Sequence, residues 1–77
     1  MVTFDRISHD PAKMNGQPCI RGMRLTVRRV LEALGRYPDR HQLFAEYPEL
    51  DEEDIRQVLA FAAANLDDKL LPLRPAG

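Results

Sequence analysis

The sequence predicts a mostly α-helical domain in which a short N-terminal β-hairpin is followed by a bundle of three helices. Apolar residues recur at intervals of three and four in two stretches, as on the buried face of an amphipathic helix. Thr26, Asp39 and Asp51, which are residue types that favour helix N-termini, precede the three segments predicted to be helices. The first 22 residues instead hold Asp-Pro and Asn-Gly turn signals. With 77 residues, the chain makes one domain.

Two short apolar segments, at 4–8 and 18–21, are predicted to be the strands of the hairpin. The loop between them is too long for a tight hairpin turn. Gly22 is expected to turn the chain into the first helix. Both Gly16 and Gly22 are interpreted as turn residues that adopt a positive φ, which glycine does without steric cost.

The first helix is expected to begin after Thr26, whose hydroxyl is a good N-cap. Its buried stripe consists of Val27, Val30, Leu31 and Leu34. Gly35 takes the position that follows the helix, with a proline just beyond it. A second helix is expected from Asp39, which resembles a capping box with Gln42, to Pro48.

The third helix has the clearest start signal in the chain. Asp51 is the expected N-cap, and the three acidic residues after it lie at the positive end of the helix dipole. Leu50 and Ile55 occupy the positions of a hydrophobic staple. The predicted buried stripe comprises Ile55, Val58, Leu59, Ala62, Ala63 and Leu66. Phe61 lies off this stripe, which indicates a second contact, such as a dimer face.

Charge is divided unevenly along the chain. Residues 1–40 carry eight basic and four acidic side chains, a net charge of +4, whereas residues 41–77 carry three and eight, a net charge of −5. This division suits either a chain with one anionic and one cationic partner or a solvated surface of mixed charge. Because so short a chain buries only a marginal core, we also expect a homodimer or a complex with a partner.

Several kinds of site are disfavoured by the sequence. Gly16 and Gly22 do not have the spacing of a nucleotide-binding loop. Cys19 lacks a recognisable base and oxyanion site, so it is expected to be a small buried apolar residue. With the two histidines it makes no recognisable metal site, and neither a metal nor another cofactor is predicted. No signal peptide or membrane span is recognised, which favours a cytoplasmic protein.

Two blocks of the sequence, "DPAKMNGQPCIRGMRLTV" and "YPELDEEDIRQVLAFA", resemble the family catalogued as domain of unknown function 433. The matching residues are Gly16, Pro18, Ile20, Gly22, Arg24, Leu25 and Val27, then Tyr47, Pro48, Leu50, Asp54 and Ile55. The resemblance covers residues 5–66, and Met23 departs from the threonine usual in the family. It implies a small bundle of homeodomain-like or winged helix-turn-helix type. Members are regarded as antitoxins of the VapB type, often encoded beside a PIN-like ribonuclease toxin.

The resemblance therefore implies an antitoxin of a type II toxin–antitoxin pair. Residues 1–66 would form a single helix-turn-helix-like antitoxin domain, and residues 67–77 a C-terminal apolar tail. The protein would be a homodimer without enzymatic activity, and its partners would be a PIN-like toxin and operator DNA. Two alternatives stay open: a stand-alone DNA-binding transcriptional regulator, and a dimerisation or adaptor module without nucleic-acid affinity.

The DNA-binding residues are expected in the basic half of the chain, at Arg21, Arg24, Arg28 and Arg29, because guanidinium groups bind phosphates and read guanine. Alternatively, Arg21 and Arg24 pair with acidic residues of the C-terminal half and hold the hairpin to the helices. The partner-binding residues are expected in the tail, at Leu70, Leu71 and Leu73. These leucines either lie extended in a groove of the toxin or fold back on the small core or a dimer interface.

Overall fold

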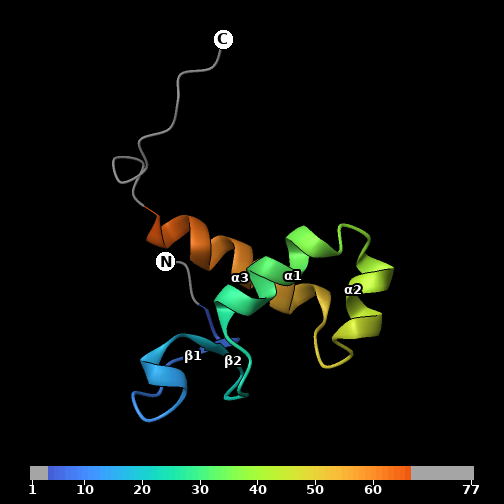
Figure 1. Cartoon of the computed structure of the whole chain (residues 1–77). Helices are drawn as coiled ribbons and strands as arrows, with labels where there is room; N and C mark the ends of the chain where they lie inside the picture. Colours follow the sequence, from blue (N-terminus) through green and yellow to red (C-terminus); the bar gives the residue numbers. More distant parts are fainter. Residues whose placement is uncertain (1–3, 67–77) are drawn as a thin grey trace.

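The computed structural model describes residues 4–66, which form a short hairpin at one end of three packed helices (Figure 1). The elements are β1 (Ile7–Ser8), the 3₁₀ turn η1 (Met14–Gly16), β2 (Cys19–Ile20), α1 (Val27–Arg36), α2 (Arg40–Glu46) and α3 (Glu52–Asn65). The two strands are antiparallel, with Ile7 opposite Ile20. The predicted mostly helical fold with an N-terminal hairpin is confirmed, although both strands are shorter than expected.

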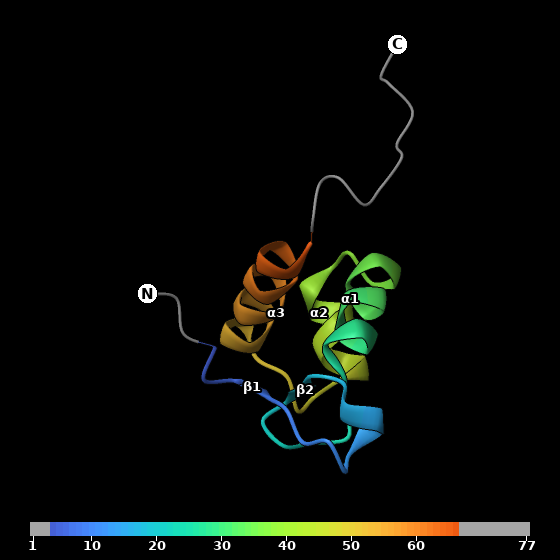
Figure 2. The ribbon, with the colours of Figure 1, turned by 90° about the vertical axis from the view of Figure 1, so that its left-hand side faces the viewer.

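The core lies among the three helices, with Ile20 of β2 at its hairpin end, and α1 packs directly against α3 (Figure 2). Its fully buried apolar side chains are Ile20, Val30, Leu43, Ile55 and Val58. However, Leu59 in the C-terminal half of α3 is 47% exposed, and Leu66, the residue that follows the helix, is 64% exposed. The stripe predicted for this helix is therefore wrong in its second half. The buried face follows Asp54, Ile55, Gln57 and Val58 and continues to the half-buried Phe61, so Leu59 and Ala63 lie to one side of it.

Phe61, the residue off that stripe, makes its second contact within the chain. Its ring meets the Phe4 ring edge to face, with 5.3 Å between the ring centroids. This geometry is a favourable arrangement of two aromatic rings. The N-terminal segment is thereby packed against α3 ahead of β1.

The three predicted N-caps are all confirmed. Thr26 Oγ1 accepts a hydrogen bond from Arg29 N at 3.0 Å, and Asp39 Oδ1 accepts one from His41 N at 2.8 Å. At α3 the N-cap Asp51 and the N3 residue Asp54 bond reciprocally in a full capping box. Such side chains satisfy amide groups that have no partner inside the helix.

The predicted end of α1 at Gly35 is wrong, because the helix includes Gly35 and continues to Arg36. Tyr37 N still donates to Ala33 O at 2.8 Å. The helix ends there because Tyr37 precedes Pro38, and a residue before proline is disfavoured in the α conformation.

The predicted positive φ of two glycines is confirmed, at +77° for Gly16 and +73° for Gly22. Arg21, with φ of +46°, is also left-handed. Together Arg21 and Gly22 reverse the chain after β2, and Met23 N closes the turn by donating to Ile20 O at 2.8 Å. This turn leads the chain from the hairpin to the N-cap of α1.

Substituting alanine at two glycines is expected to change stability in opposite directions. A Cβ would meet open space at both positions, but only Gly22 is left-handed. Gly22→Ala should lower the free energy of unfolding by about 1 kcal/mol, because a left-handed φ brings Cβ too close to the backbone. Gly35→Ala should raise it by about 0.5–1 kcal/mol, because alanine is favoured over glycine inside a helix. Urea unfolding followed by circular dichroism measures both, and two shifts of the same sign would contradict the expectation.

Candidate nucleic-acid interface

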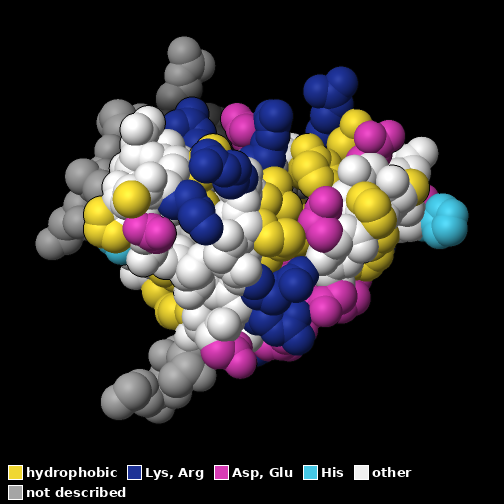
Figure 3. Space-filling view, turned by 90° about the horizontal axis from the view of Figure 1, so that it is seen from below, with side chains coloured by type: hydrophobic (Ala, Val, Ile, Leu, Met, Phe, Trp, Pro, Cys, Tyr) yellow, Lys and Arg dark blue, Asp and Glu magenta, His cyan; other side chains and the backbone are white. Residues whose placement is uncertain are grey.

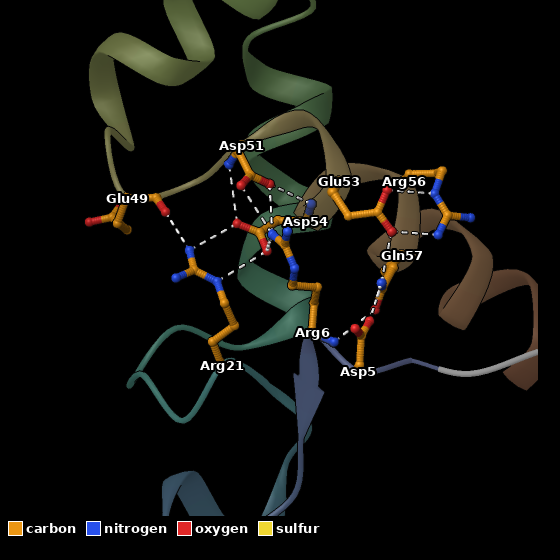
Figure 4. Close-up of polar contacts among 9 residues, drawn as sticks. All are labelled: Asp5, Arg6, Arg21, Glu49, Asp51, Glu53, Asp54, Arg56 and Gln57. Carbon is orange, nitrogen blue, oxygen red and sulfur yellow. Dashed lines mark hydrogen bonds and ion pairs between the residues drawn. The ribbon is translucent and has the colours of Figure 1, made fainter.

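A buried carboxylate joins the hairpin to α3 (Figure 4). The side chain of Asp54 is fully buried and accepts hydrogen bonds from two guanidinium groups. Arg6 Nη1 lies 2.9 Å from Oδ1, and Arg21 Nη2 lies 2.9 Å from Oδ2. Arg6 precedes β1 and Arg21 follows β2, so both strands are held by one residue of α3.

Asp51 completes this group, which we call the Asp54 cluster (Arg6, Arg21, Asp51 and Asp54). Asp51 Oδ1 accepts from Asp54 N at 2.9 Å and from Arg6 Nη1 at 2.9 Å. The hydrogen bond from the Asp54 amide, followed by that from Arg6, holds the pKa of the Asp51 carboxyl below its ordinary value. In turn, hydrogen bonds to Asp54 raise the pKa of Arg6 and of Arg21. Arg6, Arg21 and Asp51 are therefore ionised at neutral pH.

A second polar group is centred on Glu53, which precedes Asp54 in the first turn of α3. Glu53 Oε1 accepts from Arg56 Nε at 2.9 Å, and Glu53 Oε2 accepts from Gln57 Nε2 at 2.8 Å. These hydrogen bonds, from Arg56 first and Gln57 second, lower the pKa of Glu53 from its ordinary 4.5 to about 2. Gln57 also accepts from Arg6 N at 2.8 Å, so this group too touches the start of the hairpin.

The acid stability of the domain is expected to depend on these carboxylates. Because folding lowers the pKa of Glu53, its ionisation stabilises the folded state above pH 4.5, and this contribution is lost as the pH falls toward about 2. Folding also lowers the pKa of Asp51, so its ionisation stabilises the folded state in the same way. The urea midpoint should therefore fall across this range, and it should fall less in Glu53→Gln. An equally steep fall in the variant would show that Glu53 is not responsible.

Four arginines on and beside α1 form a second, different arrangement, which we call the cationic face (Arg24, Arg28, Arg29 and Arg36). Each ion pair within residues 4–66 involves another arginine, namely Arg6, Arg21, Arg40 or Arg56. All four residues of the cationic face are exposed, and within residues 4–66 they take part in none of these pairs. Their positive charge is therefore directed at solvent.

The cationic face surrounds two adjoining surface hollows. One, of about 330 Å³, is lined by Arg24, Arg28 and Arg29, and the other, of about 570 Å³, by Arg29 and Arg36. Glu32 lines both hollows and is the acidic side chain within the face. Seen from below, basic side chains follow one edge of the molecule, while others lie against acidic side chains at the opposite edge (Figure 3).

The structure brings together three of the four arginines predicted to bind DNA. Arg24, Arg28 and Arg29 line the same hollow. Arg21 instead has the alternative role left open for it, because it pairs with Asp54. Arg36 was missed when the helix was predicted to end at Gly35, although its spacing of seven residues from Arg29 is the signal that would have found it.

The remaining candidate residues give a mixed result. Cys19 is buried, as predicted, and its thiol Sγ lies 3.3 Å from the Gln17 carbonyl oxygen that accepts its hydrogen bond. Leu70, Leu71 and Leu73 lie outside the described residues. Within residues 4–66, no three His, Cys, Asp or Glu side chains are grouped so that they can hold a metal ion. In this same part of the chain, no helix has the length and apolar character needed to cross a membrane.

A family model described as "Protein of unknown function (DUF433)" matches residues 7–62. The chain belongs to the DUF433 family. Comparison with curated proteins and with solved structures gives no significant match. The range matched in this DUF433 chain runs from β1 into α3 and includes Arg21, Asp54 and the whole cationic face.

Proposed function

We propose that this DUF433 protein is the antitoxin of a type II toxin–antitoxin pair. It would act in the cytoplasm as a non-enzymatic homodimer that binds and neutralises a PIN-like ribonuclease toxin and represses its own operon by binding DNA. Support comes from the resemblance to the DUF433 family, whose members are regarded as antitoxins of the VapB type, and from one structural observation, the division of the arginines into a paired set and the cationic face.

This division separates arginines that stabilise the fold through ion pairs from arginines whose charge is available to a binding partner. The acidic start of α3 is neutralised by the paired arginines, for example by Arg40 Nε, which lies 3.0 Å from Glu52 Oε1. The cationic face has no such neutralisation within residues 4–66 apart from the nearby Glu32. A patch of exposed guanidinium groups attracts a polyanion and binds its phosphates with a salt-dependent affinity.

For the DNA complex we assign α2 and α3, joined by residues 47–51, to a helix-turn-helix pair in a homeodomain-like bundle. In the common docking geometry the N-terminus of the second helix enters the major groove. Here that N-terminus carries Asp51, Glu52 and Glu53. Because these carboxylates would meet phosphates there, we place the phosphate contacts on α1 and its cationic face instead.

The toxin contact is assigned to the tail, at Leu70, Leu71 and Leu73. An apolar segment interrupted by proline suits an extended conformation in a groove of the partner. Binding by the tail would leave the cationic face free for DNA, so one chain would engage both partners at the same time.

Co-expression of the tagged protein with the product of its neighbouring gene tests this function. The expected result is a stoichiometric complex and relief of the neighbour's toxicity, both of which are lost in the variant with serine at positions 70, 71 and 73. If the wild-type chain forms no complex and toxicity persists, the antitoxin function is wrong. Specific binding to upstream DNA would then identify a stand-alone regulator, and no DNA affinity would identify an adaptor module.

A further inference from the structure

The uncovered half of α3 borders a continuous apolar groove. Two adjoining hollows, of about 720 and 270 Å³, share Pro18, Phe61 and Asn65 in their linings. The first reaches Phe4 and Ile7 at the start of the hairpin, and the second reaches the first turns of α1. We define the α3 groove by six lining residues, Pro18, Leu31, Phe61, Ala62, Asn65 and Leu66.

The groove extends the core beyond the point where α1 stops covering α3. Ala62 lies on the side of the helix that buries Ile55 and Val58 nearer its start, because these positions recur at helical spacing, and the C-cap Leu66 lines the same hollow. Leu66 nevertheless remains 64% exposed. A row of apolar side chains that continues from the core into solvent is typical of a surface that another segment covers.

We propose that the α3 groove is the binding site for the chain's own residues 67–77, whose three leucines fold back along α3 and complete the core. The groove ends at Leu66, which is the residue from which the tail continues. Four extended residues span about 13 Å, so Leu70 reaches Phe61, which lies only about one helical turn before Asn65.

Charge and connectivity favour the tail over a second copy of the chain. Arg28 lines the groove and has no ion-pair partner within residues 4–66, while Asp67 and Asp68 follow Leu66 directly. The two acidic residues are therefore available to Arg28 when the leucines dock. A tethered segment also acts at an effective concentration in the millimolar range, above that of a free copy at ordinary protein concentrations.

Docking of the tail would make it a self-inhibited binding element. A partner that takes up Leu70, Leu71 and Leu73 would have to remove them from the groove, which lowers its apparent affinity. This consequence rests on the proposed function, whereas the docking itself does not. The two are distinguishable because the docking is measured on the isolated chain, without toxin or DNA.

Nuclear Overhauser effects in the isotope-labelled full chain test the docking directly. The expected result is contacts between the methyl groups of the three leucines and the ring of Phe61. These contacts should be absent from the isotope-filtered spectrum of a mixture of labelled and unlabelled chains, because they arise within one molecule. Contacts that persist in the filtered spectrum would assign the groove to a second copy, and an absence of contacts in both spectra would also overturn the proposal.

A matched pair of alanine substitutions tests whether the groove itself holds the tail. Ala62 lines the groove, whereas its neighbour Ala63 is exposed outside it. In Ala62→Glu the heteronuclear NOE values of the tail amides should fall to those of a free chain, and in Ala63→Glu they should stay unchanged. Equal effects of the two variants would overturn the proposal.

A tail variant keeps the proposal testable if Ala62→Glu fails to fold. Leu71→Ser changes only the tail, and it should shift the amide resonances of groove residues such as Phe61 and Leu66 while leaving those of α2 in place. Unchanged groove resonances in Leu71→Ser would overturn the docking.

Discussion

Asp54→Asn is expected to lower the free energy of unfolding by about 2–3 kcal/mol. Removing one partner from a buried ion pair commonly costs about 3–5 kcal/mol, because the remaining charge is left without compensation. Here the loss should lie at or below the lower end of that range, because the side chains of Arg6 and Arg21 are 29% and 39% exposed and regain some hydration. The substitution also weakens the capping box of α3.

The matched control for this substitution is Glu52→Gln, which removes an acidic residue from the same helix turn. Glu52 is 65% exposed and pairs with Arg40 at the surface, where an ion pair contributes about 0–1 kcal/mol. Urea unfolding compares the two variants, and hydrogen exchange locates the loss. Faster exchange at the hairpin amide of Ile20 than at Leu43 in α2 is expected for Asp54→Asn. Equal destabilisation by both substitutions would contradict the role assigned to Asp54.

The N-termini of the helices were predictable because their signals are local. A Thr or Asp side chain reaches an amide two or three residues ahead, so the N-caps Thr26, Asp39 and Asp51 depend on little beyond their neighbours. The end of α1 was not predicted correctly, because Gly35 and Pro38 both signal a stop and the proline determined it. The buried face of α3 was not predicted correctly, because Asp54 and Gln57 are buried by their contacts with Arg6, and the apolar periodicity of the helix does not contain these contacts.

The types of residue in the candidate site were predictable, but the sequence did not show which arginines form ion pairs and which belong to the cationic face. The sequence shows that arginines gather before residue 40 and acidic residues after it. Which arginine pairs with which carboxylate depends on contacts 33 and 48 residues apart, such as Arg21 with Asp54 and Arg6 with Asp54. The left-handed conformation of Arg21 and the short distance from β1 to α3 are tertiary features. Only the structure therefore separates the Asp54 cluster from the cationic face.

Binding to DNA is expected to weaken with salt according to the number of arginines in the cationic face. Each phosphate neutralised contributes about −0.9 to the slope of log affinity against log salt, so four arginines, with Arg28 exchanging the tail carboxylates for a phosphate, give about −3.6 per protomer. The affinity should then fall about 150-fold between about 50 and 200 mM salt. In the double variant Arg24→Gln, Arg29→Gln the slope should shrink to about −1.8 and the loss to about 12-fold.

The control for this measurement removes the same charge from arginines outside the face. Arg40→Gln, Arg56→Gln lowers the net charge by the same amount, but these arginines pair with Glu52 and Glu53. Its slope should equal that of the wild type. Glu32→Gln should have the opposite effect and strengthen binding, because it removes the acidic side chain that lines both hollows of the face. If the two double variants weaken binding equally, the affinity follows net charge alone, and the cationic face is not the DNA-binding surface.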